Sequence, residues 1–244
     1  MTRRTVPAIA AVLLLAGCGG AGSNSSPSSG LPQGSEKIEL DPADFTTEID
    51  NPYWPMSPGS RWVYREVENG DAQRVTVTVT DRTKTIDGIE ARVVHDLVTT
   101  PDGERVEDTF DWYAQDSKGN LWYLGEDTKE YEDGKVVSTE GSWEHGVDGA
   151  QAGIVVAAEP RQGLAYREEY YSGEAEDAAE VLSVDGKVQV PFGFFREAMI
   201  TRNYSGIEPT VEELKFYAED VGPVLELLVS GGAGRTELLS YTEP

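Results

Sequence analysis

A short stretch near the middle of the chain gathers residue types that bind ligands. Trp143, Glu144, His145 and Asp148 supply an aromatic ring, two carboxylates and an imidazole close together. They lie in the segment 128–162, which begins with a predicted hairpin and then becomes rich in Gly and Ala. Loops of about 20 residues without regular structure are often functional. We therefore take these four residues as the candidate ligand-binding site, with the alternative that Trp143 fills the core.

Carboxylates are the most abundant reactive groups, because the chain has 44 Asp and Glu against 20 Lys and Arg. Calcium prefers about six to eight oxygen ligands, so calcium is the cofactor that these acids would suit. The spacing before Gly134 departs from the EF-hand pattern, since Lys129 and Tyr131 occupy ligand positions. Solvated faces of strands explain the same runs, and no metal-binding residues are assigned. The runs are Glu104, Glu107, Asp108 and Asp111; Glu126, Asp127, Glu130, Glu132 and Asp133; and Glu174, Glu176 and Asp177.

Motifs that announce catalysis are missing from the sequence. The two histidines, His95 and His145, form no HExxH motif, and the chain contains no GxSxG or GxxxxGK[ST]. A single cysteine excludes CxxC redox chemistry. A pair of carboxylates could hydrolyse a glycoside, but a chain this acidic always offers some suitable pair. We therefore predict a protein that is not an enzyme and assign no catalytic residue.

The beginning of the chain has the most specific motif. Arg3 and Arg4 precede an apolar run that is too short to span a bilayer, which needs about 20 apolar residues. The run ends in Leu-Ala-Gly-Cys, which resembles the lipobox of bacterial lipoproteins. The resemblance implies a signal peptide over residues 1–17 and lipidation of Cys18. Residues 18–37 are rich in Gly, Ser and Pro and predict a flexible tether. The mature protein would then be lipid-anchored at the extracytoplasmic face of the cell membrane.

Charge limits the partners. The formal net charge is −24 at pH 7, and removal of the signal peptide makes the mature chain more negative still. Such a chain repels nucleic acid and anionic lipid and attracts cations and basic partners. We therefore exclude nucleic acid as a partner, although high acidity also keeps an exported protein soluble.

Residues 38–244 read as strands almost throughout. Val75, Val77 and Val79 alternate with threonines, and the dipeptides Asn69-Gly70, Asp87-Gly88, Asp102-Gly103, Asp133-Gly134 and Asp185-Gly186 predict hairpin turns. Long amphipathic helical windows are missing, which favours an antiparallel meander. We predict an all-β fold that forms a curved sheet, an open barrel or a sandwich.

Parts of the sequence recur at an offset of 104 positions. The segment Phe110 to Asp116 returns as Leu214 to Asp220, and scattered identities support two repeated units, 59–126 and 163–231, that flank the insert 128–162. If the duplication is real, Trp112 and Phe216 should point from equivalent strands to equivalent faces. These aromatic residues are then mainly scaffold.

Four segments carry a family resemblance: IDNPYWPMSPGSRWVY, DWYAQDSKGNLWYLGED, GKVVSTEGSWEHGVDGAQAGI and FYAEDVGPVLE. They resemble a group of uncharacterised, mostly actinobacterial secreted β-rich lipoproteins, over nearly all of residues 45–241. The resemblance implies no particular ligand. His145 stands where the group's WEAGVDGA pattern has Ala, which argues against a catalytic role for it.

Two functions follow from the anchor and the strand-rich domain. The first is a non-catalytic module that binds an unknown protein or small-molecule partner. The alternative is a carrier of lipid or another apolar molecule, which would need a large apolar cavity. Calcium binding and hydrolysis are weaker alternatives.

Overall fold

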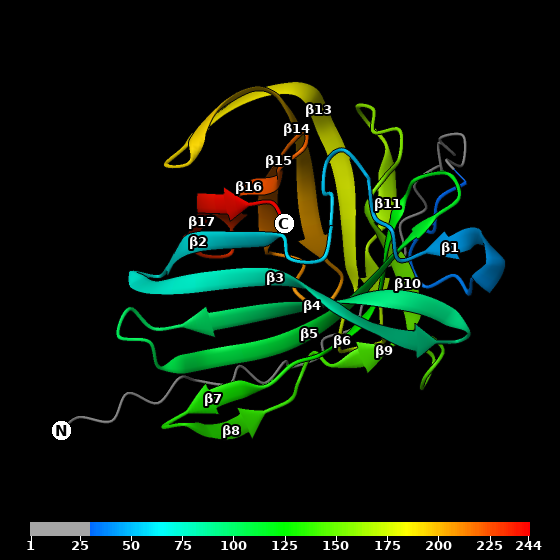
Figure 1. The fold of residues 1–244 in the computed structure, drawn as a ribbon, viewed down its shortest axis with the longest axis horizontal. Helices are drawn as coiled ribbons and strands as arrows, with labels where there is room; N and C mark the ends of the chain where they lie inside the picture. The colour runs from blue at the N-terminus through cyan, green and yellow to red at the C-terminus, as the bar shows by residue number, and fades with distance from the viewer. Residues whose placement is uncertain (1–29) are drawn as a thin grey trace, which may run out of the picture.

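The computed structural model describes residues 30–244, and it confirms the all-β prediction. Within these residues the regular elements are one 3-10 turn and strands that pair antiparallel (Figure 1). The elements are η1 (Pro42–Asp44), β1 (Phe45–Thr46), β2 (Arg61–Glu68), β3 (Asp71–Ile86), β4 (Ile89–Thr99), β5 (Arg105–Asp116), β6 (Leu121–Asp127), β7 (Glu130–Glu132), β8 (Lys135–Ser138), β9 (Trp143–Glu144), β10 (Gln151–Val156), β11 (Ala165–Arg167), β12 (Glu169–Tyr170), β13 (Asp177–Val190), β14 (Gly193–Ser205), β15 (Glu212–Ala218), β16 (Gly222–Ser230) and β17 (Gly234–Thr242).

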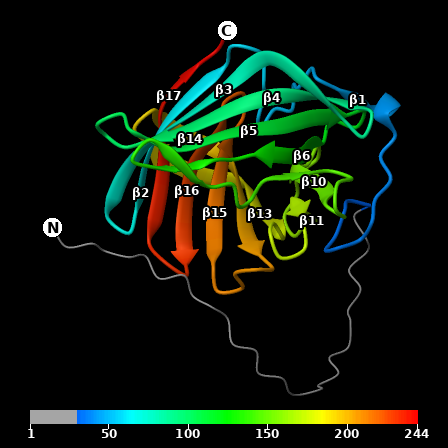
Figure 2. The same ribbon diagram turned by 90° about the horizontal axis from the view of Figure 1, so that it is seen from below.

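The sheet curls into a nearly closed barrel, one of the architectures that the sequence predicts. Strands β2 to β6 form one meander and β13 to β17 form another, while β10, β11 and β12 join them. The last strand, β17, pairs along β2, where Leu238 lies opposite Tyr64. Figure 2 shows these two strands side by side. The first strand of the first meander therefore pairs with the last strand of the second.

One seam of the barrel is weakly joined. Strand β10 pairs with β12 at two positions, whereas β2 pairs with β3 along the whole length of β2. Gly153 makes the close approach at the seam, because a Cβ there would lie 2.4 Å from the carbonyl oxygens of both Arg167 and Glu168. The seam therefore requires glycine at this position.

Most of the predicted turns and the predicted alternation are confirmed. Asn69-Gly70, Asp87-Gly88 and Asp133-Gly134 connect consecutive strands with positive φ at both residues, the conformation that such dipeptides favour. Val77 and Val79 are buried on the inner face of β3. The period-two pattern thus identifies the inner face of that strand.

The turn predicted at Asp185-Gly186 is wrong. Both residues lie inside β13, and the chain reverses after Val190 instead. Pairing between β13 and β14 shifts register around Gly186, and a Cβ there would lie 2.5 Å from the side chain of Ile200. Glycine marks a bulge with a close contact here, a use that a dipeptide pattern does not distinguish from a turn.

The segment between β1 and β2 closes one end of the barrel. Trp54 contacts Tyr113 of β5 and Tyr217 of β15, with ring centroids 5.6 and 6.4 Å apart. Gln115 holds the segment to β5 by accepting hydrogen bonds from the backbone N–H groups of Asp50 and Asn51. The apolar core lies around this plug, and its fully buried side chains include Met56, Trp62, Ile86, Ile89, Leu121, Ile154, Tyr166 and Met199.

The described part of the predicted tether packs against the barrel. The Arg167 side chain donates hydrogen bonds of 2.8 Å to the carbonyl oxygens of Gly34 and Glu36, and its backbone N–H donates to Pro32. Residues 30–37 are therefore held on the wall, because a buried guanidinium needs these acceptors. Residues 1–29, which include Cys18 and the rest of the predicted tether, lie outside the described residues.

The two predicted repeats have the same strand order at an offset of 104. Strands β3 and β13 end at Ile86 and Val190, and β4 and β14 begin at Ile89 and Gly193. The register differs: Val93 pairs with Trp112, so an unchanged repeat would pair residue 197 with Phe216, but Ile200 takes that place.

The faces of the repeated strands agree, because Tyr113 and Tyr217 both point inward to Trp54. Their neighbours Trp112 and Phe216 therefore both point outward. The duplication stays a prediction.

Candidate functional site

Alternation along the strands sends a set of acidic side chains into the barrel. On β5 the inward face of Tyr113 continues through Asp111 to Glu107, since alternate residues of a strand share a face. The same relation holds on β15, where Lys215 and Glu213 share the inward face of Tyr217. The lumen carboxylates, as we name this set, are Glu66, Asp96, Glu107, Asp111, Glu126, Glu168, Glu169, Asp177, Glu213 and Glu226.

All of these carboxylates except Glu107 line three adjoining cavities. The largest measures about 310 Å³ and is lined by acids of β6, β12, β13 and β15. A middle cavity of about 260 Å³ shares Glu213 with the largest one and Glu226 with an inner cavity of about 150 Å³. Among the described residues that line the largest cavity, Lys215 is the single base. The shared residues place the three cavities side by side along the barrel interior, and acids line each of them.

Aromatic side chains form a belt across the lumen beside the acids. Tyr217, Trp54, Tyr113, Tyr123 and Trp143 follow one another with ring centroids 5.0 to 6.4 Å apart. The belt thus runs from β15 to β9, and its residues Trp54 and Tyr113 line the inner cavity beside the carboxylates. Aromatic faces next to carboxylates give both a surface for methylene groups and an attraction for cations.

Burial shifts the acids of the first meander towards the neutral form. Desolvation raises the pKa of Asp111 to about 7, although the Tyr123 hydroxyl donates to Asp111 at 2.7 Å and opposes the rise. Desolvation and the nearby Asp111 raise the pKa of Glu126 to about 8. Desolvation, with Asp111 and Glu107 nearby, also raises the pKa of Asp96 well above its usual range. A cation entering this region would reverse these shifts by favouring the charged carboxylates.

The acids of the second meander surround Lys215. Burial opposes the charge on Lys215, but the carboxylates of Glu226 and Glu168 outweigh it and raise the pKa of the lysine well above its usual range. Lys215 lies 3.9 Å from Glu226 and 4.0 Å from Glu213, so neither contact is a short ion pair. Desolvation raises the pKa of Glu168 to about 7, even though Asn203 donates to it at 2.7 Å. One lysine therefore shares its charge among several carboxylates.

Four polar atoms at the lumen are buried without a hydrogen-bond partner. They are Oδ1 of Asp96 and Nε1 of Trp54 in the inner cavity, Oε2 of Glu169 in the largest cavity and Nε1 of Trp143. The indole of Trp143 is near enough to Glu169 to offset part of the rise in the carboxyl pKa, yet the two atoms do not complete a hydrogen bond of normal geometry. Buried polar groups are normally satisfied, so these atoms need an explanation.

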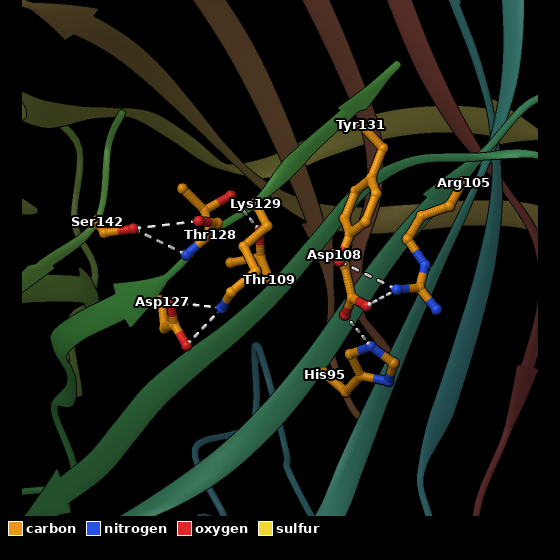
Figure 3. Close-up of polar contacts among 9 residues, drawn as sticks. All are labelled: His95, Arg105, Asp108, Thr109, Asp127, Thr128, Lys129, Tyr131 and Ser142. Carbon is orange, nitrogen blue, oxygen red and sulfur yellow. Dashed lines mark hydrogen bonds and ion pairs between the residues drawn. The ribbon is translucent and has the colours of Figure 1, made fainter. Parts of the chain in front are cut away.

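On the outer face of the same wall, acidic side chains have basic partners. Figure 3 shows Asp108 of β5 between two bases, with Nε2 of His95 at 2.7 Å and a guanidinium nitrogen of Arg105 at 2.9 Å. Further along, Lys129 binds Asp127 at 2.8 Å. Solvent and bases thus neutralise the outward acids that alternate with the lumen carboxylates.

The structure separates the four residues that the sequence proposed as a site. Trp143 is 4% exposed and points into the lumen, where its ring meets Tyr123 edge-on at 5.4 Å. Glu144, its neighbour on β9, binds Lys84 at 2.7 Å, and that lysine lies over the ring of Trp112. Trp143 therefore belongs to the lumen, whereas Glu144 belongs to the outer face.

His145 and Asp148 do not belong to the lumen either. His145 is 4% exposed, and its Nδ1 accepts a hydrogen bond from the backbone N–H of Ala152 at 3.0 Å. Burial lowers the pKa of His145, so the ring is held neutral as a structural acceptor. Asp148 is exposed in a turn with φ of 50°. The insert is also less irregular than expected, because β10 within it forms part of the barrel wall.

Four of the ten lumen carboxylates, Glu107, Asp111, Glu126 and Asp177, belong to the runs of acids that the sequence showed, and the other six do not. Alternation divides each run: Glu107 and Asp111 point inward while Asp108 points outward. The signal was available on β5, where Asp111 shares a face with Tyr113 and Gln115. Among residues 30–244 no three His, Cys, Asp or Glu side chains are gathered closely enough to hold a metal ion.

Comparisons with known proteins are sparse. No protein-family model matches the chain, and no curated protein matches it. One similar solved structure is a chain from Parabacteroides distasonis that is provisionally described as a lipoprotein. It matches with a TM-score of 0.43 and 11% identity over 78% of this chain and 98% of the other. A TM-score below 0.5 is too low to support an argument about function. In the described part of the chain no helix is long and apolar enough to cross a membrane.

Proposed function

We propose that this protein is a lipid-anchored, extracytoplasmic binding protein that holds a small polar ligand inside its barrel without catalysing a reaction. One observation supports the proposal above all: beside the apolar core, the interior contains open space lined by buried acidic side chains and a lysine. Burying charge is costly without a partner, so an acidic interior needs a compensating role. A cavity of about 310 Å³ is also within the usual range for small-molecule sites.

The lining of the cavity favours a polar ligand over a lipid. A carrier of acyl chains needs a large apolar cavity. The largest cavity is lined by Glu126, Glu168, Glu169, Asp177 and Glu213, and the more apolar inner cavity measures only about 150 Å³. A second function as an apolar carrier is therefore less well supported.

The binding site can be tested by filling the lumen. Ser205 lines the largest cavity at the end of β14, so Ser205→Trp should exclude a ligand. Lys135→Trp adds the same side chain at an exposed position of the β7–β8 hairpin and is the matched control. Native mass spectrometry of protein purified from its natural host should show a small bound molecule in the wild type and the control, and not in Ser205→Trp.

Two results would contradict the proposal. A bound molecule retained by Ser205→Trp would place the site outside the lumen. An adduct that extracts into organic solvent as a lipid would instead support the carrier.

The anchor is tested separately at Cys18. Cys18→Ser removes the sulfur that would carry the lipid, so the protein should leave the membrane fraction and lose palmitate labelling. Labelling that persists in Cys18→Ser would contradict the anchor and leave the lumen proposal unaffected.

A further inference from the structure

The three cavities together form an elongated site. The inner cavity is lined by Asp96, Asp111 and Glu226, and the largest by five other lumen carboxylates. The middle cavity joins them through Glu213 and Glu226. Acidic groups therefore occur at both ends of a row of three neighbouring cavities and along its length. A ligand that matched this pattern would carry positive charge at more than one position.

Unsatisfied acceptors lie at both ends of that row of cavities. Oδ1 of Asp96 in the inner cavity and Oε2 of Glu169 in the largest cavity are inaccessible to solvent and have no hydrogen-bond partner. A carboxylate oxygen accepts hydrogen bonds, so each position calls for an N–H or O–H donor. Donors that also carry positive charge make the strongest bonds to carboxylates. The two unpartnered oxygens point to a ligand independently of the number of acids.

The surfaces between the acids suit methylene groups. Val75, Val77 and Val94 line the inner cavity together with the rings of Trp54 and Tyr113. Aliphatic carbons pack on such surfaces, and an ammonium or guanidinium group next to an aromatic face gains further attraction. The inner cavity thus offers apolar contact beside its acids.

We infer that the lumen binds an elongated organic polycation, with two or more amine or guanidinium groups joined by methylene chains. The inference deepens the proposed function and rests on it. One cationic group lies at Asp96 in the inner cavity and another at Glu169 in the largest cavity. The acidic mouth also raises the local concentration of cations, which favours their entry.

Isothermal titration of the full chain with spermidine tests the inference. The titration is done at pH 8.5, above the pKa of about 7 for Asp111 and about 8 for Glu126, so that these two acids are charged. Spermidine should bind, and n-butylamine, which has one amine on a similar carbon chain, should bind at least about tenfold more weakly because it reaches only one end.

Variants at the two ends provide the structural control. Asp96→Asn and Glu169→Gln keep the shape of each side chain and remove its charge, so each should weaken spermidine binding about tenfold or more. Asp127→Asn removes a carboxylate that is 51% exposed and binds Lys129 on the outer face, and it should leave binding unchanged. Equal weakening by Asp127→Asn would show unspecific attraction to an acidic protein and overturn the inference.

The remaining outcomes separate the inference from the proposed function. If spermidine does not bind while a small molecule from the natural host occupies the lumen, the polycation is wrong and the binding protein stands. If calcium binds and spermidine does not, a metal replaces the polycation. If neither spermidine nor any host molecule enters the lumen, both proposals fail.

Discussion

On the outer face of β5, Asp108 has His95 at 2.7 Å and Arg105 at 2.9 Å, whereas Asp111 of the same strand faces the lumen and receives a hydrogen bond from the Tyr123 hydroxyl. The two acids are close in sequence and belong to one strand. Alternation alone decides that one is neutralised at the surface and the other is buried among further acids. The outer acids help to keep an acidic protein in solution. The inner acids are unfavourable for stability, because burying charge without a partner costs free energy.

The difference between the faces teaches where function should be sought in this chain. A net charge of −24 makes any single carboxylate uninformative. Carboxylates become informative when they gather on the buried side of a wall and most bases lie on the other side. Lys84, Arg105 and Lys129 all bind outward acids, while Lys215 faces the lumen.

Of the changes considered, removal of the inward lysine Lys215 should have the largest effect on the free energy of unfolding. Lys215→Met keeps the length of the side chain but leaves Glu168, Glu213 and Glu226 without a counter-charge, and we expect a loss of about 2–4 kcal/mol of unfolding free energy at pH 8. The matched outer variant, Lys84→Met, loses its contact with Glu144 and should cost only about 1 kcal/mol. Urea denaturation of both variants measures the difference.

A double variant sharpens this prediction. Glu226→Gln added to Lys215→Met removes one of the unpaired carboxylates and should restore part of the lost stability. Equal losses for Lys215→Met and Lys84→Met, or no recovery in the double variant, would show that the inner and outer bases are energetically alike.

The sequence predicted the strands and the barrel class better than the site. Alternating valines and Asn-Gly or Asp-Gly turns follow from local backbone preferences. The sequence therefore predicted β3 and the turns at Asn69-Gly70, Asp87-Gly88 and Asp133-Gly134. The role of Gly186 could not be predicted, because it depends on Ile200 of the next strand. The repeat stays a prediction: β3 and β13 end, and β4 and β14 begin, at the offset of 104, but the register of the corresponding strand pairs differs.

The candidate site needed the tertiary structure for a different reason. Trp143 and Glu169 come together across the seam, and no local pattern connects residues on β9 and β12. Asp96 gave no signal in the sequence, since a single acid in a strand is ordinary. Only closure of the barrel shows that it shares a lumen with Asp111 and Glu226. Conversely, the insert looked like a loop because β10 is short and rich in Ala and Gly.

The difference between inner and outer acids should also appear, as a smaller effect, in the pH dependence of stability. Burial raises the folded-state pKa of Asp111 to about 7 and of Glu126 to about 8, from ordinary values of 3.8 and 4.5. Between about pH 4 and pH 8 the folded state therefore binds more protons than the unfolded chain, so stability falls as the pH rises. The Asp111 carboxylate is itself one cause of the raised pKa of Glu126, and the open mouth admits water. We therefore expect their joint contribution to be about 1–3 kcal/mol, or several degrees in Tm.

The matched variants decide whether that slope belongs to the lumen. Asp111→Asn with Glu126→Gln mimics the protonated pair at every pH, so Tm should fall less between pH 5.5 and pH 8.5 than in the wild type. The residual slope should come from Glu168 and Glu213, whose pKa burial raises to about 7. The control, Glu132→Gln with Asp133→Asn, removes two exposed acids of the β7–β8 hairpin and the same net charge. If the control flattens the slope as much as the lumen variant does, general repulsion in an acidic protein explains the pH dependence. If stability instead rises with pH in the wild type, the lumen acids are not held in their neutral form.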